Sequence, residues 1–323
     1  MTTVTGGARR RLLMPGPAEV SFVRRGFHAS APAARQLLER SAGQFLVGLG
    51  HGLGGDDGRL VHRSLAAVDR PLRGFAHEGA AMGLAVTDAL TPGRGRRLAD
   101  FAAGPAVDHI YMVHVGSGWA MARLPRPLWR RAVLPDPLLR WLALDGYGFH
   151  QAYFATDRYV RQQRPVTVHP PWPDPSGYAA RAADQGIGRA LWFVFGADVE
   201  RLAAQIDAFE ADRRPDLWAG TGLAATYAGG VDAVDLDRLV KLAAGYRPHL
   251  AQGSAFAAQA RRRARLITGH TGDAVRVICG TGVDEAAGIT QATLAGLPAA
   301  DGPVPAFELW RRRIQDRFGD LED

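Results

Sequence analysis

Cysteine and long hydrophobic runs are nearly absent from this sequence of 323 residues. Cys279 is its one cysteine, so an internal disulfide framework and a cysteine-rich zinc site are excluded. The longest apolar candidate, 111–122, is short, contains glycine and includes His114, so we expect no transmembrane helix. The arginines at 9–11 are not followed by an apolar segment, so we expect no secretory leader. A reducing cytoplasm fits these absences.

Lysine is almost missing as well. Lys241 is the one lysine among 39 basic residues, and the net charge is +7. A basic surface favours acidic partners such as an acidic protein, a phosphorylated ligand, nucleic acid or a membrane surface. Aromatic residues do not alternate with the arginines as a base-stacking platform requires, so we expect no nucleic acid. We expect mostly solvated faces at the arginine clusters, which span 9–11, 94–97, 130–131, 213–214, 261–265 and 311–313.

A short pattern recurs along the chain. It consists of a polar residue, a small residue, any residue and usually another small residue. The small residue in second place occurs at 79, 116, 152, 186, 220, 253 and 286, at spacings of 33 to 37 residues. Gly43 is a candidate for an earlier copy. Small residues let neighbouring helices approach closely, and a period near 34 is that of tetratricopeptide arrays.

The sequence therefore predicts an all-α fold, a helix-turn-helix repeat array of the tetratricopeptide or Sel1-like kind. We expect about seven repeats in a right-handed superhelix. The predicted divisions are a basic segment with a lead-in helix at 1–40, the repeat domain at 41–298, and a capping helix at 299–323. A membrane-surface role for that last helix is the alternative.

The residue patterns of individual segments predict helices. An apolar stripe of Val199, Leu202, Ile206 and Phe209 predicts a helix over 198–209. Asp235 is the predicted N-cap of the next helix. The composition of 108–115 is typical of a strand, although a buried helix fits it too. In the last helix, one face gathers Phe307, Trp310, Ile314, Phe318 and Leu321.

Asp145, Tyr147 and His150 form the first candidate site. Tyr147 and His150 are three residues apart and would share a helix face, while Asp145 could cap the helix or orient the imidazole. These three groups can support acid–base chemistry. A histidine packed in the core and satisfied by backbone carbonyls is the alternative.

The polar residues that precede the small ones form the second candidate. They are Glu78, Gln151, Gln185, Gln252 and Glu285. Such a row could line a groove, or could bond adjacent repeats as a ladder, which explains its periodicity better. Glu78 and His114 lie where the early repeats differ, and we add them to the catalytic candidates. Trp119 and Trp192 are the candidate apolar walls of the groove.

Other chemistries find little support. No His-x-x-x-His pair occurs, so we expect no metal site. No Gly-x-Ser-x-Gly elbow occurs either, which disfavours a serine hydrolase. The Gly-x-Gly stretches lack a preceding strand, so phosphate-binding loops are not supported. The sequence indicates no particular cofactor.

Five ordered stretches resemble a known family. They are 17–28, 73–85, 144–150, 184–194 and 249–258. Over roughly 14–318 the chain resembles domain-of-unknown-function family 1702, found with enediyne polyketide gene sets in actinobacteria. It departs at Gln151-Ala152, where the family is expected to carry Glu-Gly. If that glutamate is catalytic, an enzymatic role is weakened here.

The resemblance implies a pathway rather than a reaction. We expect an accessory protein of enediyne biosynthesis that binds or processes a polyene or enediyne-core intermediate in a groove. One alternative is a non-catalytic scaffold whose arginine-rich faces dock the polyketide synthase, its acidic carrier domain or membrane-bound pathway proteins. Another is self-resistance by sequestering the product. Whether the chain is an enzyme stays open.

Overall fold

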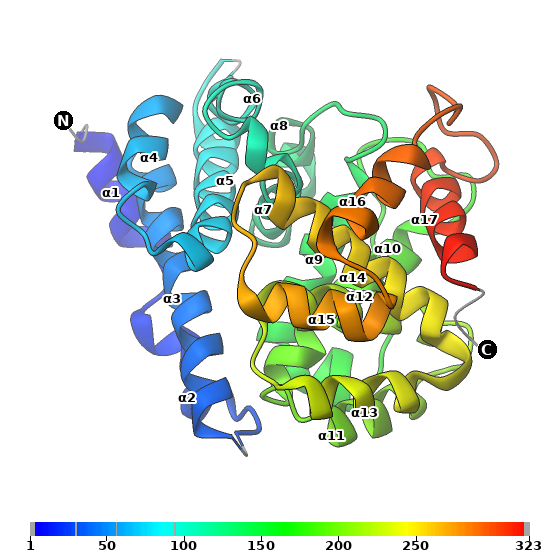
Figure 1. The fold of residues 1–323 in the computed structure, drawn as a ribbon. Coiled ribbons are helices and arrows are strands. Elements are labelled where there is room, and N and C mark those ends of the chain that lie inside the picture. The colour runs from blue at the N-terminus through cyan, green and yellow to red at the C-terminus, as the bar shows by residue number, and fades with distance from the viewer. Residues whose placement is uncertain (1–3, 30, 56, 94, 320–323) are drawn as a thin grey trace.

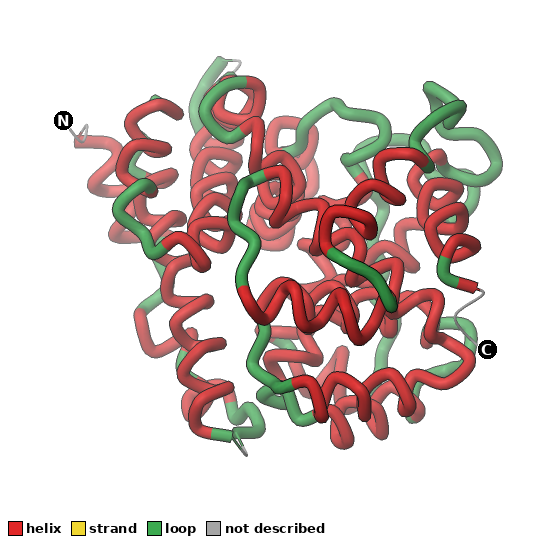
Figure 2. Tube along the Cα trace, viewed as in Figure 1, coloured by secondary structure: helices red, strands yellow, loops and turns green. Residues whose placement is uncertain are grey.

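The computed structural model describes residues 4–29, 31–55, 57–93 and 95–319, and over these residues it contains helices and no strand (Figures 1 and 2). The all-α prediction is confirmed. No helix among these residues is both long and apolar enough to cross a membrane. The α-helices are α1 (Val4–Leu13), α2 (Phe22–Arg25), α3 (Pro32–Leu53), α4 (Gly58–Leu65), α5 (Arg73–Leu90), α6 (Arg97–Ala103), α7 (Ile110–Arg123), α8 (Trp129–Ala132), α9 (Trp141–Phe154), α10 (Tyr178–Val194), α11 (Val199–Asp207), α12 (Arg214–Ala228), α13 (Ala233–Ala243), α14 (Arg247–Arg263), α15 (Gly269–Cys279), α16 (Val283–Ala292) and α17 (Ala306–Arg317).

Most of the longer helices form one row in which each packs on the next. The row runs α3, α5, α7, α9, α10, α12, α14 and α16. Shorter helices lie between its members in the sequence, and α11, α13 and α15 pack side by side as an outer layer (Figure 1). Between α9 and α10 the chain has a π-helical turn, Asp157–Arg161, and a proline-rich loop in place of an outer helix.

The row helices approach each other through a repeated Gly-x-Gly motif. In α9, a Cβ atom added to Gly146 would lie 2.0 Å from the carbonyl oxygen of Val115 in the preceding row helix. One added to Gly148 would lie 2.0 Å from the carbonyl oxygen of Ala183 in the following row helix. Equivalent pairs of contacts occur in α7, α10 and α12. The glycines thus set the close spacing of the helices, which also explains why they form no phosphate-binding loop.

This contact pattern corrects the predicted register of two repeats. In the third repeat the packed residue is Gly146, 30 residues after Gly116 and 40 before Gly186, and Ala152 is not the equivalent position. Gly43, the candidate early copy, has no atom within 4 Å of an added Cβ. Spacing alone misplaced the third repeat because the spacings on its two sides are 30 and 40 residues rather than equal.

Helices that are far apart in the row meet. Phe75 of α5 packs edge-on against Tyr227 of α12, with ring centroids 5.3 Å apart. Arg261 of α14 donates to the carbonyl oxygen of Pro71 at 2.6 Å. The backbone amide of His28 donates to the carbonyl oxygen of Val194 at 2.8 Å. The early and late helices of the row therefore lie against each other.

Several predicted elements are confirmed and others are corrected. Helix α11 buries its predicted stripe, and its N-cap is Asp198. Asp232, rather than Asp235, caps α13, because its carboxylate accepts the amides of Val234 and Asp235. The segment 108–115 is helical. The predicted boundary at residue 40 falls within α3, which is already the first helix of the row.

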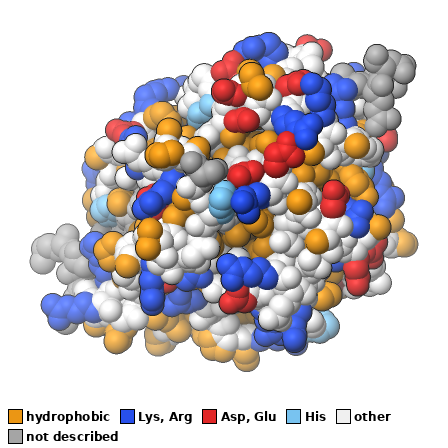
Figure 3. Space-filling model, turned by 90° about the horizontal axis from the view of Figure 1, so that it is seen from below, with side chains coloured by type: hydrophobic (Ala, Val, Ile, Leu, Met, Phe, Trp, Pro, Cys, Tyr) orange, Lys and Arg blue, Asp and Glu red, His pale blue; other side chains and the backbone are white. Residues whose placement is uncertain are grey.

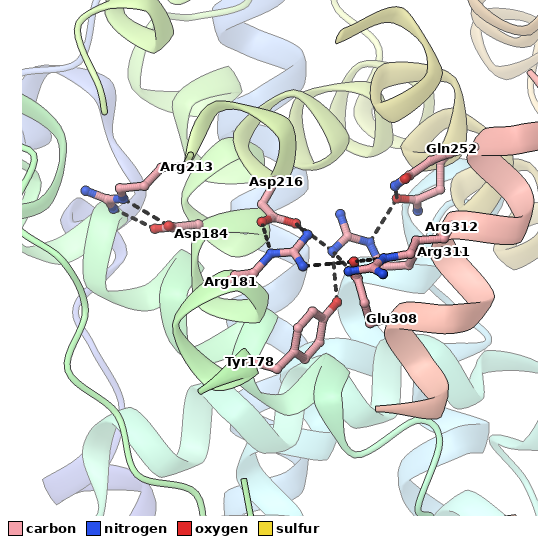
Figure 4. A network of polar contacts seen from close by, with 10 residues as sticks. Tyr178, Arg181, Asp184, Arg213, Asp216, Gln252, Glu308, Arg311 and Arg312 are labelled. Carbon is pink, nitrogen blue, oxygen red and sulfur yellow. Dashed lines mark hydrogen bonds and ion pairs between the residues drawn. The ribbon is translucent and has the colours of Figure 1, made fainter. Parts of the chain in front are cut away.

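The last helix, α17, packs on α14 and α16 through Phe307, Trp310, Ile314 and Phe318, which are all buried, whereas Leu321 lies outside the described residues. A buried polar network also joins it to the row (Figure 4). Arg311, fully buried, donates to Asp216 at 2.6 Å and to Tyr178 at 2.8 Å. Arg181 pairs with Asp216 at 2.8 Å and with Glu308 at 2.8 Å.

Several arginines of the predicted solvated clusters have an internal role instead. Arg213, Arg261 and Arg311 are buried, which corrects that expectation for them. Arg131 donates to the carbonyl oxygen of Ala89 near the end of α5, and Arg313 to that of Thr293 after α16. Carbonyl groups at helix ends lack helical partners, so these guanidinium groups stabilise them. On the face in Figure 3, basic and acidic side chains are interspersed.

Candidate functional site

An apolar chamber, chamber one, lies among α3, α5, α7 and α9, with Phe193 of α10 at its side. It encloses about 630 Å³ of space free of protein atoms, including solvent at its mouth. Its apolar walls include Phe45, Leu49, Met82 and Trp119. The Trp119 ring packs against that of Phe45, with the two ring centroids 4.4 Å apart.

Chamber two lies on the other side of Phe75 and Phe193 and encloses about 670 Å³ measured in the same way. Its apolar walls come from α7, α12 and α14 and include Met112, Leu223 and Phe256. Phe75, Phe193 and Arg189 line both chambers. The two chambers are therefore neighbours across one partition.

Arg189 of α10 holds a buried charge cluster at this partition. Its guanidinium forms an ion pair with Asp145 of α9 and lies 3.7 Å from the carboxylate of Glu78 of α5. Gln185 donates to Asp145 at 2.8 Å, and the indole N–H of Trp119 donates to Glu78 at 2.9 Å. Three helices of the row thus place one cation and two carboxyl groups among apolar walls.

Burial raises the pKa of Glu78 to about 7, against the attraction of Arg189, while the charge of Asp145 adds to the increase. Glu78 lines chamber one. A carboxyl group with this pKa is partly protonated at neutral pH, so it can either donate or accept a proton there. The cluster can therefore hold or move a proton next to an apolar ligand.

His150 and Tyr153 of α9 are two further polar side chains that line chamber one. Their exposed fractions are 7% and 3%. Neither ring nitrogen of His150 has a hydrogen-bond partner, nor does the hydroxyl of Tyr153. Burial lowers the pKa of His150 to about 3, and the charges of Arg123 and Arg25 add to the decrease. The imidazole is therefore neutral at pH 7 and can donate one hydrogen bond and accept one.

The family model of DUF1702, described as a protein of unknown function, matches residues 4–318. The chain belongs to this family. No curated protein and no solved structure matches it. Its DUF1702 membership therefore brings no assigned activity or residue roles, and the site rests on its geometry.

The structure separates the predicted Asp145–Tyr147–His150 group. Asp145 and His150 are five residues apart in α9, which places them about 140° apart around the helix. Asp145 faces Arg189, so it neither caps the helix nor orients the imidazole. Tyr147 packs edge-on against Trp129, with centroids 5.6 Å apart, and lines neither chamber.

The remaining predicted residues divide between the chambers and the helix contacts. Glu78 and Trp119 line chamber one, whereas Trp192 is buried outside both chambers and donates to the carbonyl oxygen of Gly229 at 2.9 Å. His114 is also buried outside both, and burial lowers its pKa to about 4.

The predicted polar row changes in two members. Glu285 is exposed and accepts a hydrogen bond from Thr281, just before its own helix. Asp145 precedes the packed Gly146 and takes the place assigned to Gln151, which lies one and a half turns further along α9 and lines neither chamber. Gln185 and Gln252 bond to neighbouring helices, the latter accepting from Arg311 at 2.9 Å. These two glutamines therefore act between helices rather than as chamber walls.

Sequence reasoning missed Arg189, Phe75, Phe193 and Tyr153. Arg189 follows Gln185 by one helical turn, so the correct register of the row could have indicated it. The two phenylalanines carry no comparable sequence signal. Among the described residues, no three histidine, cysteine or acidic side chains are arranged to hold a metal ion.

Proposed function

We propose that this protein is an accessory protein of enediyne biosynthesis that binds a polyene or enediyne-core intermediate in chambers one and two. The observation that carries the proposal is the pair of apolar chambers meeting at Phe75, Arg189 and Phe193. Two adjoining apolar spaces suit a long, thin chain better than a compact ligand. The sequence resemblance adds the pathway, in which such chains are made.

The proposed role of Glu78 is to hold or move a proton beside the bound chain. Its raised pKa and its place in the wall of chamber one support this role. A neutral carboxyl group is also compatible with an apolar ligand, whereas an unpaired carboxylate would be costly to bury. We also propose that the row of helices is a repeat array of the tetratricopeptide type whose curvature brings α5 against α12.

The binding proposal is tested with the methyl ester of trans-parinaric acid, a fluorescent, uncharged conjugated tetraene. The purified protein should enhance its fluorescence saturably, with about one probe per chain. Ala42→Phe places a ring in the wall of chamber one and should weaken binding about tenfold or more. Ala292→Phe, at an exposed position of α16, is the matched control and should bind as the wild type does. Equal binding by both variants, or none by the wild type, contradicts the proposal.

The pathway is tested by native mass spectrometry after co-expression with the polyketide synthase. A co-purifying small molecule of polyene mass supports the proposal. A stable complex with a synthase fragment and no small molecule supports the scaffold alternative instead. Tight binding of the finished product, but not of the polyene, supports self-resistance.

A further inference from the structure

Chamber one contains polar groups that no part of the described protein satisfies. The two ring nitrogens of His150 and the hydroxyl of Tyr153 are buried without hydrogen-bond partners. A buried polar group left unpaired destabilises the folded protein. In the network around Arg311, Tyr178 and both carboxylates accept hydrogen bonds from arginines, although one guanidinium nitrogen of Arg311 also lacks a partner. The unpaired groups of chamber one therefore point to a ligand that supplies their partners.

A cation without an ion-pair partner lies at the edge of the same chamber. Arg123 lines chamber one, is exposed to solvent, and makes no ion pair or hydrogen bond with a described residue. The other cation near His150, Arg25, is paired with Glu19 at 3.2 Å and donates to the carbonyl oxygen of Tyr153 at 2.8 Å. Chamber one thus offers one available positive charge beside two buried hydrogen-bonding side chains.

We propose that chamber one binds the carboxylate end of a long unsaturated acyl chain. The carboxylate accepts hydrogen bonds from the hydroxyl of Tyr153 and from one N–H of His150, and it faces the guanidinium of Arg123. Two carboxylate oxygens can accept about four hydrogen bonds, so one group has enough acceptor sites for all three side chains. The chain then lies along the apolar wall toward Phe75. This inference rests on the proposed function and specifies the class of ligand.

Other ligand classes fit these groups less well. A pure hydrocarbon leaves the atoms of His150 and Tyr153 unpaired. A phosphate group carries nearly two charges, whereas one available cation lines this chamber, the guanidinium of Arg189 being already paired with Asp145. The carboxylate of Glu78 at the partition also disfavours an anion there, so the charged end belongs near Arg123 and the tail near Glu78.

The test compares trans-parinaric acid with its methyl ester at pH 8, where the acid is ionised. Wild-type protein should bind the acid about tenfold more tightly. Tyr153→Phe should reduce this ratio about three- to tenfold, because it removes one donor and keeps the ring. Arg123→Met should also reduce the ratio, and Arg59→Met, which changes an exposed arginine of α4 outside both chambers, should leave it unchanged.

Thermal unfolding checks that the variants fold. Tyr153→Phe removes an unpaired buried hydroxyl, so the ligand-free variant should be at least as stable as the wild type. A loss of acid preference without a loss of stability therefore reports recognition rather than folding. If wild-type protein binds both probes equally, the carboxylate inference is wrong while the proposed function stands. If it binds neither, both are wrong.

Discussion

At Gly146 the absence of a side chain decides how closely two helices approach. The α9 backbone lies so near that of α7 that an added Cβ atom would overlap the carbonyl oxygen of Val115. Glycine inside a helix costs about 1 kcal/mol relative to alanine, so its presence needs a packing reason. The contact supplies that reason.

We expect Gly146→Ala to lower the free energy of unfolding by about 3 kcal/mol or more, because the row helices must separate or shift. Gly43→Ala is the matched control, since nothing lies within 4 Å of its added Cβ atom in α3. That variant should gain about 0.5–1 kcal/mol. Urea unfolding measures both changes. Equal effects of the two substitutions would show that the Gly-x-Gly contacts do not hold the row.

The candidate site was predictable residue by residue only in part. Glu78, Trp119 and His150 were selected from the sequence and line chamber one. Arg189 and Tyr153 could not be selected, because the direction of their side chains depends on how α10 and α9 are rotated about their axes. That rotation is set by contacts between helices, which a single sequence does not display.

At the scale of whole elements, helix identity followed from local patterns, whereas register did not. Helix α11 was predicted with its buried stripe because amphipathic periodicity is local. The third repeat was misplaced because its packed glycine lies 30 residues after Gly116 and 40 before Gly186, which departs from the even spacing of the other copies. Only the contact of Gly146 with α7 fixes that position.

The docking of α17 yields a prediction for an element. Arg311→Met leaves Asp216 and Glu308 buried with one cation fewer, so we expect the free energy of unfolding to fall by about 3 kcal/mol. Arg317→Met changes an exposed arginine of the same helix and should alter stability by less than about 0.5 kcal/mol. Limited proteolysis should cleave the Arg311 variant first near 299–305. Unchanged stability of that variant would mean that apolar contacts alone dock α17.

At the scale of the whole molecule, closure of the row explains why so many charged and titratable groups are buried. The inner side of a curved array is exposed when its ends are apart. Here Phe75 of α5 and Tyr227 of α12 bring distant members of the row together, so groups that face inward there lose their solvent. The sequence predicted a groove but did not indicate its closure, since no local pattern reports that two distant helices meet.

Several histidines are buried, and this gives the protein a predicted sensitivity to acid. Burial is the main cause of the low pKa values of these histidines. The pKa is about 4 for His77 and His114, about 3 for His150 and about 2 for His109. In the unfolded chain a histidine titrates near pH 6.5. The unfolded state therefore binds more protons than the folded state between these values, and stability must fall as the pH falls below about 6.5.

Each such histidine lowers the free energy of unfolding by about 1.4 kcal/mol per pH unit in that range. Glu78 and Asp184 act in the opposite direction, because burial raises their pKa values to about 7 and about 6. Four histidines outweigh two carboxyl groups, so we expect a net loss of several kcal/mol between pH 7 and pH 5, measured by urea unfolding. His150→Phe removes one titrating group and should make the loss shallower. A free energy of unfolding that stays constant over this range would show that the histidines are solvated in the folded protein, and that the row is open in solution.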